Sequence, residues 1–445
     1  MMAMMDREEE FLSNFFNSVS HLSFDKAKEC LERGKEDSML QSPAWNLLIC
    51  ALSQFAAAEK SYVELGFFAR QKSLFKIKDN SLRSVYEHLR SVEMKRVDAL
   101  AKDSGNKTIA SVSSQLEDFM KARIELIEFY ELMQGVGSSK PVKFCELWGF
   151  LEQIVEKHAL ACPHLSLTWL KAALSLECEV LLHLVRAGAE LAEWRFLPSL
   201  MLLHGAHTRL VAWETSLGAR SSESWRLGSF LTSTRLPLLH QWLVKMKSGL
   251  GAKFALLFYN TLLQQTVTSE MKALCSKLAP AVDFSQRLQS FQHKSGAVAV
   301  CIVFDMFGLP DHEGPGYKIP KLQSTPTRLS PAQVSPAAIE SPLSDPRFAQ
   351  VLCIPQAGQI NFIEVTKLIL EKAAELSTLD KVVIHFNQRE QCSVFMINFD
   401  PRLTLAAVFN GKKSDKETMA TSFLLETAAQ LRGNRLLASL KPGAK

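Results

Sequence analysis

The hydrophobic period of this chain changes at residues 297–309 (AVAVCIVFDMFGL), and that change constrains the fold more than any other feature. Large apolar side chains alternate there with smaller ones, and a period of two predicts a β-strand. Neither face is polar, so we expect the strand to be buried on both sides within a sheet. A buried helix is the alternative, but the β-branched residues and the stop at Gly308–Pro310 favour the strand.

Before this stretch, apolar residues recur at three- and four-residue spacing, which predicts amphipathic helices joined by short loops. The segment 165–193 is apolar over most of its circumference, so we expect it at the centre of a bundle. The pattern predicts a helical bundle over residues 1–280. Its expected helices cover residues 6–20, 24–36, 43–70, 81–102, 108–134, 141–159, 165–193, a segment starting near residue 198, and 236–278.

Local signals set several of the expected helix ends. Ser42 and Pro43 give the clearest start, as an N-cap and a first helical residue whose missing N–H costs nothing. The glycines of Gly135–Ser139 should end the helix over 108–134. Residues 218–228 should form a polar loop, and the helix after it should kink near Gly249–Gly251.

After the stretch, a different architecture is expected. One helix over 283–293 precedes it, and a final helix should begin at a Ser414–Glu417 capping box and end at Gly433. A helix over 361–376 should begin at a similar box formed by Asn361 and Glu364. Further strands are predicted at 348–354, 381–386, 394–399 and 403–409.

This order predicts a mixed fold, in which a C-terminal α+β domain with a five-stranded antiparallel sheet follows the bundle over residues 281–445. Residues 310–346 hold eight of the seventeen prolines, so we expect a flexible insertion within that domain. The element order resembles the roadblock and longin group of small domains. That resemblance implies a docking and dimerising platform, by analogy at the level of the fold.

Composition excludes several classes of function. A formal charge of +5 over 445 residues, without a basic cluster, does not favour nucleic-acid binding. The nine cysteines form no C-x-x-C pair, which favours reduced, buried thiols over disulfides or zinc. An acidic N-terminus is not typical of a targeting peptide, and no run of 18 apolar residues lacks a charge. We therefore expect a cytosolic chain that reaches membranes only through partners.

One pair of residues is a candidate for chemistry. His204 and His207 lie at i and i+3 on an expected helix, so they share a face. A metal site needs a third ligand, and Glu193 and Glu214 lie two to three turns away. Structural histidines are therefore favoured, and no cofactor, metal or catalytic residue is predicted. A helical-bundle enzyme or metal-binding protein with a site near these histidines is the alternative.

Five segments resemble the KICSTOR complex subunit two family, and the likeness extends over essentially the whole chain. They are SFDKAK (Ser23–Lys28), AAAEKSY (Ala56–Tyr62), EWRFLPSLMLLHGAHTRL (Glu193–Leu210), TSEMKAL (Thr268–Leu274) and ASLKPGAK (Ala438–Lys445).

The resemblance implies a non-enzymatic scaffold subunit of the KICSTOR complex, peripheral at the lysosomal membrane. That complex recruits the GATOR one complex to lysosomes and restrains mTOR complex one when amino acids or glucose are scarce. The implied partners are other KICSTOR subunits and the GATOR one complex, and the roadblock-like domain implies a homodimer.

Over Trp194–Trp213, which includes most of the matched Glu193–Leu210 segment, we expect the side chains mainly to form core that joins the two halves of the chain. Its family-matching residues are Trp194, Phe196, Leu197, Pro198, Ser199, His204 and His207.

Overall fold

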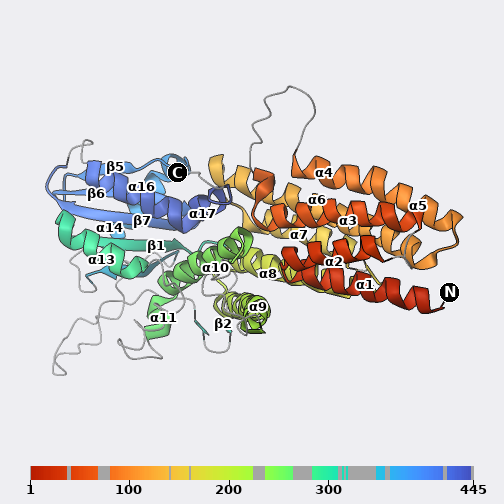
Figure 1. Ribbon diagram of the computed structural model, residues 1–445. Coiled ribbons are helices and arrows are strands. Elements are labelled where there is room, and N and C mark those ends of the chain that lie inside the picture. The colour runs from red at the N-terminus through yellow and green to blue at the C-terminus, as the bar shows by residue number, and fades with distance from the viewer. Residues whose placement is uncertain are drawn as a thin grey trace.

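The structure is a computed structural model of the chain, and its elements fall into a helical half and a sheet half (Figure 1). It describes residues 2–441 except 38–41, 69–80, 140–141, 160–161, 224–235, 264–282, 309–312, 315–316, 319–346, 356–360 and 414–417.

The N-terminal half is built from helices, as the spacing of its apolar residues predicts. The described helices are α1 (Met2–Ser20), α2 (Phe24–Glu36), α3 (Pro43–Val63), η1 (Gly66–Phe68), α4 (Leu82–His88), η2 (Leu89–Glu93), α5 (Met94–Asp103), α6 (Lys107–Ser139), α7 (Phe144–His158), η3 (Leu165–Leu167), α8 (Thr168–Ala192), α9 (Phe196–Glu223), α10 (Leu238–Leu257) and α11 (Tyr259–Leu263).

Several helix ends agree with their sequence signals and others do not. The Ser42 hydroxyl caps α3 by accepting a hydrogen bond of 3.1 Å from the backbone N–H of Trp45. However, α3 ends at Val63, and α10 ends at Leu257 without a break at its glycines. The predicted loop at 218–228 begins late, because α9 extends to Glu223.

The predicted helix end at Gly135–Ser139 is wrong, because α6 continues through these residues to Ser139. Gly137 has a packing role instead. A Cβ at this position would lie 2.5 Å from the backbone nitrogen of Ala438, the last residue of α17 (Asn434–Ala438), which packs against α6. The glycine therefore allows the last helix of the sheet half to approach the helical half closely.

The sheet half contains the predicted five-stranded antiparallel sheet, in the order β4-β1-β7-β6-β5. Every residue of β1 from Ala299 to Phe304 is buried, which confirms a strand covered on both faces. The strands are β1 (Ala299–Asp305), β4 (Phe348–Ile354), β5 (Val383–Asn387), β6 (Cys392–Asp400) and β7 (Leu403–Asn410). A separate two-stranded pair joins β2 (Glu313–Gly314) to β3 (Tyr317–Lys318).

Helices cover the two faces of the sheet differently. One face packs against α14 (Phe362–Glu371) and α15 (Ala373–Leu376) and forms a small apolar cluster. The other face packs against α13 (Phe284–Ser295) and α16 (Thr418–Arg432). This second face belongs to one continuous core that also contains the interior of the helical half. The two halves therefore share a core.

Some sequence predictions for the sheet half were wrong or fall outside the described residues. Asn361 precedes α14 but its side-chain oxygen accepts no capping bond, and its amide nitrogen donates to the Glu390 carboxylate at 3.2 Å. The α17 helix was not predicted. The boundary at residue 280, the Ser414–Glu417 box and all of 310–346 apart from β2 and β3 lie outside the described residues.

Candidate functional site

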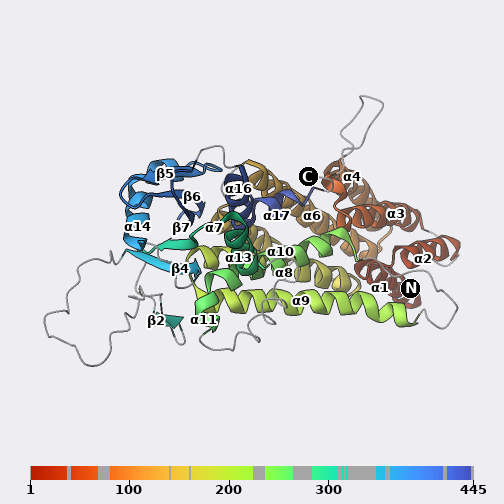
Figure 2. The same cartoon turned by 90° about the vertical axis from the view of Figure 1, so that its left-hand side faces the viewer.

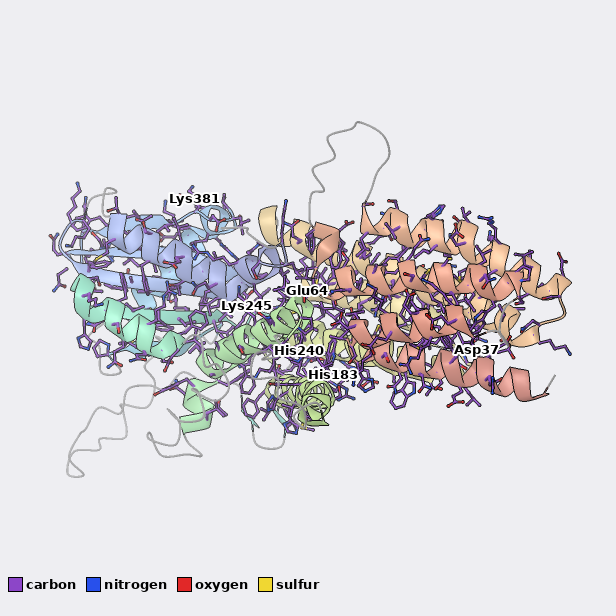
Figure 3. The ribbon with its side chains drawn as sticks, viewed as in Figure 1. Asp37, Glu64, His183, His240, Lys245 and Lys381 are labelled. Atoms are coloured by element: carbon purple, nitrogen blue, oxygen red, sulfur yellow. The ribbon has the colours of Figure 1, made fainter. Side chains whose placement is uncertain are left out.

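The family-matching segment forms the start of α9, which runs along one edge of the molecule (Figure 2). Its main neighbours are α8 and α10. Figure 3 labels one residue on each of them, His183 on α8 and His240 on α10. Since these two helices cover only part of its circumference, α9 has one face in the core and one face in solvent.

Among the family-matching residues, Trp194 joins the two halves, whereas Phe196 and Ser199 make their contacts within the helical half. The Trp194 ring stacks on Phe304 of β1, with ring centroids 4.3 Å apart. The Phe196 ring stacks on Phe254 of α10 at 5.3 Å. Ser199 is buried, and its hydroxyl donates a 2.5 Å hydrogen bond to a carbonyl one turn earlier. The Trp194 contact places the start of α9 against the sheet, and the Phe196 contact places it against α10.

The other four family-matching residues, Leu197, Pro198, His204 and His207, are exposed. The expectation that the segment is mainly core is therefore wrong for half of its circumference. Met201, in the same segment, has 60% of its surface exposed. The prediction failed because α9 carries apolar residues on both faces, so the periodicity alone does not distinguish the buried face from the exposed one.

The two histidines do not assemble a metal site among the described residues. No group of three or more His, Cys, Asp or Glu side chains suited to a metal ion occurs there. Burial and the nearby Lys247 ammonium lower the pKa of His207. A cationic neighbour also repels a metal ion, so the local electrostatics do not favour the alternative function.

A buried ionic cluster, which we call the Arg123 cluster, lies inside the helical half. Arg123 of α6 donates to Glu59 of α3 at 3.1 and 2.9 Å and to Glu177 of α8 at 2.5 Å. The three side chains are 3–5% exposed. The guanidinium therefore bridges two carboxylates from different helices in a site closed to solvent.

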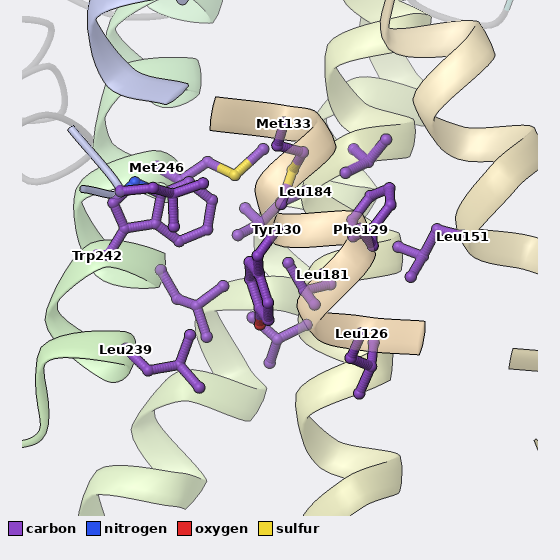
Figure 4. Close-up of a cluster of buried hydrophobic side chains, with 14 of the residues drawn as sticks. Leu126, Phe129, Tyr130, Met133, Leu151, Leu181, Leu184, Leu239, Trp242 and Met246 are labelled. Atoms are coloured by element: carbon purple, nitrogen blue, oxygen red, sulfur yellow. The ribbon is translucent and has the colours of Figure 1, made fainter. Parts of the chain in front are cut away.

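Three tyrosines complete the Arg123 cluster. Tyr86 donates to Glu59 at 2.7 Å, while Tyr62 and Tyr130 donate to Glu177 at 2.6 and 2.9 Å. Burial, together with the neighbouring carboxylates, raises the pKa of all three phenols well above 10. Figure 4 shows Tyr130 surrounded by apolar side chains, with Trp242 and Leu181 nearby.

The Arg123 cluster is suited to holding helices together rather than to chemistry. Each of its four carboxylate oxygens accepts at least one hydrogen bond, and α3, α4, α6 and α8 all contribute side chains. Sequence reasoning missed it, because the partners of Glu177 come from other helices. The signal was its position between Leu174 and Leu181 on the buried stripe of α8.

A cavity of about 450 Å³ lies at one end of the sheet, beside α14 and α15. Asp305 and Arg347 on its wall form a bidentate pair with distances of 2.9 and 2.7 Å. The Arg402 guanidinium donates to backbone carbonyls of Asp305 and Phe307. These three charges are engaged in holding the strand ends together.

The described helices include none that is both long and apolar enough to cross a membrane.

Comparison with known proteins identifies the family. A family model described as "KICSTOR complex C12orf66 like" matches residues 3–445. The chain is 32% identical over 455 aligned positions to KICSTOR subunit 2 of Xenopus laevis, covering 100% of this chain and 98% of that protein. It is 32% identical to KICSTOR subunit 2 of Danio rerio, covering 99% and 97%. The chain therefore belongs to the KICSTOR complex C12orf66-like family.

Proposed function

We propose that the chain is a non-enzymatic scaffold subunit of the KICSTOR complex. In this role it helps to recruit the GATOR one complex to lysosomes, and so restrains mTOR complex one when amino acids or glucose are scarce. The observation that carries the proposal is the similarity to KICSTOR subunit 2 over the full length of both proteins. The partners are the other KICSTOR subunits and, through the assembled complex, the GATOR one complex.

The interior of the chain is consistent with a scaffold. Its buried polar groups in the Arg123 cluster are bonded to one another and 3–5% exposed, so no substrate reaches them. One apolar core connects the helices to the sheet, which makes the two halves a single support for surfaces on either side. A scaffold needs such a support, because it holds partners in a fixed geometry.

The sheet half offers a second docking platform. Apart from the β2–β3 pair and the short helices α15 and α17, the order is a helix, two strands, a helix, three strands and a helix, which resembles roadblock-like domains. The strands β4 and β5 are the two edges of the five-stranded sheet. An edge strand presents unpaired backbone groups that pair readily with another chain. We place a homodimer contact in this half on that basis, with membrane attachment supplied by partners.

Affinity capture of the chain from cells starved of amino acids or glucose tests the proposal. The other KICSTOR subunits should be recovered with it, and in its absence mTOR complex one should stay active during starvation. Recovery of no KICSTOR subunit, with the chain intact and folded, would contradict the proposed function.

A further inference from the structure

An uncharged stripe runs along the solvent side of α9. It consists of residues 197, 201, 204, 208 and 211, which are three or four positions apart and therefore lie in one line along the helix. Leu197, Met201 and Val211 are 47%, 60% and 44% exposed, and Val244, three residues before Lys247 on α10, is 36% exposed. We define the α9–α10 face as Leu197, Met201, His204, His207, Thr208 and Val211 of α9 with Val244 and Lys247 of α10.

The stripe has the composition of an interface centre. Large aliphatic side chains and a methionine alternate with histidine and threonine, without a carboxylate, lysine or arginine among the positions of α9. Depletion of charge at the centre is what distinguishes protein interfaces from the remaining surface. From Leu197 to Val211 the stripe is ~21 Å long, which matches a partner helix of about four turns.

Charged side chains of both signs border the stripe, including the exposed Glu214 of α9, and they differ in whether they are paired. The two arginines on the α8 side are neutralised, since Arg209 pairs with Glu179 at 2.5 Å and Arg195 with Glu190 at 3.1 Å. Lys247 has no carboxylate within ion-pair distance among the residues that the structure describes, and α10 contains no acidic residue. Lys247 is half-buried against His207. Lys247 therefore places an unpaired positive charge beside the uncharged stripe of α9.

We propose that the α9–α10 face binds an amphipathic helix of another KICSTOR subunit, whose acidic residues lie against Lys247 and the two histidines. This rests on the proposed function and adds a location and a partner chemistry to it. The apolar side of the partner helix covers Leu197, Met201 and Val211, and its carboxylates supply the charge that the face lacks.

Two other occupants fit the face less well. A second copy of the chain would bring two Lys247 residues and four histidines together across a two-fold axis, without a carboxylate on the stripe to compensate them. A membrane-binding helix has a wide apolar face with many basic residues on the other side. Here the stripe is narrow, and both arginines that border it are already paired.

Charge variants of the full-length chain test the face. The other KICSTOR subunits are co-expressed with wild type, Met201→Glu, Lys247→Glu or the control Met419→Glu, which alters a 54%-exposed methionine of α16. We expect about tenfold or more weaker assembly for Met201→Glu and a clear loss for Lys247→Glu, with the control unchanged. Thermal melts of the Met201→Glu and Met419→Glu chains should equal that of wild type, because both methionines are exposed. A melt of Lys247→Glu checks that this half-buried position still allows folding.

The dependence of assembly on ionic strength distinguishes a charged contact of Lys247 with the partner from a purely structural role of this residue. Assembly of the wild-type chain should weaken as salt rises, and Lys247→Met should make that dependence shallower. Equal salt slopes for the two proteins would contradict the charge complementarity on which the proposal depends.

Cross-linking identifies the occupant. A photoreactive residue at position 201 should link to an acid-containing helical segment of another KICSTOR subunit, and one at position 419 should not. Linking to a second copy of the chain would overturn the proposal. So would wild-type binding to vesicles of phosphatidylcholine and phosphatidylserine that Met201→Glu abolishes.

Failure of this inference is distinguishable from failure of the proposed function. If wild type assembles with KICSTOR subunits and the folded Met201→Glu and Lys247→Glu variants assemble equally well, the α9–α10 face is wrong and the function stands. If wild type itself does not assemble, the proposed function fails.

Discussion

The helical half and the sheet half hold their elements together by different means. In the helical half, Arg123 joins carboxylates from α3 and α8, and three tyrosines bond to the same carboxylates. In the sheet half, β1 is apolar and buried on both faces. The register of a strand is fixed by its backbone ladder, whereas packed helices can slide along one another. We interpret the Arg123 cluster as a set of directional bonds that fixes the relative positions of the packed helices, a role that the backbone ladder fills in the sheet.

The largest effect is expected when the Arg123 cluster loses its arginine. Arg123→Met leaves two buried carboxylates without their cation, so we expect the free energy of unfolding to fall by about 3–5 kcal/mol. Urea denaturation measures it. Arg83→Met is the control, because Arg83 pairs with Glu128 at the surface and should change stability by about 1 kcal/mol or less. Equal effects of the two variants would show that the cluster holds nothing together.

The contribution of apolar packing to the sheet half is tested on β1. Phe304 is 1% exposed and stacks on Trp194, so Phe304→Ala should cost about 3–5 kcal/mol of unfolding free energy. The control is Phe307→Ala, three residues later, whose ring is 69% exposed. It should change stability by less than about 1 kcal/mol. A small effect of Phe304→Ala in urea denaturation would mean that the sheet does not depend on this core.

The contact between the halves is tested by two glycines on the same turn of α6. Gly137→Ala places a Cβ 2.5 Å from the Ala438 nitrogen, so it should destabilise by about 1–3 kcal/mol. Gly135→Ala meets nothing within 4 Å and should stabilise by about 0.5–1 kcal/mol through helix propensity. Thermal melts of the two variants should therefore shift in opposite directions, and a shared direction would contradict this packing.

Alkaline pH should weaken the helical half selectively. Because burial raises the pKa of Tyr62, Tyr86 and Tyr130, the folded chain keeps protons that the unfolded chain loses above about pH 10. Their contribution is complete below pH 10 and falls as pH rises further, by about 1.4 kcal/mol per pH unit for each phenol. Urea midpoints from pH 8 to 11 measure it. Tyr130→Phe should show a shallower fall than wild type, and parallel curves would contradict the assignment.

The smallest expected effect is a difference in thiol reactivity between exposed and buried cysteines in both halves. Burial raises the pKa of Cys162 and of Cys178 to about 12, and that of Cys353 to about 11. Cys50 and Cys145 are exposed. Among the cysteines that the structure describes, N-ethylmaleimide at neutral pH should therefore label Cys50 and Cys145 first, as peptide mass spectrometry would show. Labelling of the core thiols at equal rates would indicate a core open to solvent.

Sequence patterns predicted the element types well because local periodicity determines them. The β1 strand, the antiparallel five-stranded sheet and the Ser42 cap all follow from nearby residues. The end of α6 did not, because Gly137 serves a contact with α17 almost 300 residues later. Long-range partners of that kind leave no periodic signal.

The candidate surface was less predictable than the fold. His204 and His207 were identified, but which face of α9 is exposed depends on where α8 and α10 lie. The Arg123 cluster was missed for the same reason, since its six members come from four helices. Each alone resembles an ordinary charged or aromatic residue, and only the fold brings them together.

The central claim is that the interior fixes the fold while the α9–α10 face carries assembly. The most direct test compares the affinity of wild type, Tyr130→Phe and Met201→Glu for the other KICSTOR subunits at a temperature where all three are folded. Tyr130→Phe should lose about 1.5–3 kcal/mol of stability and still bind like wild type. Met201→Glu should melt like wild type and bind about tenfold or more weakly. Wild-type affinity of a folded Met201→Glu would contradict the account.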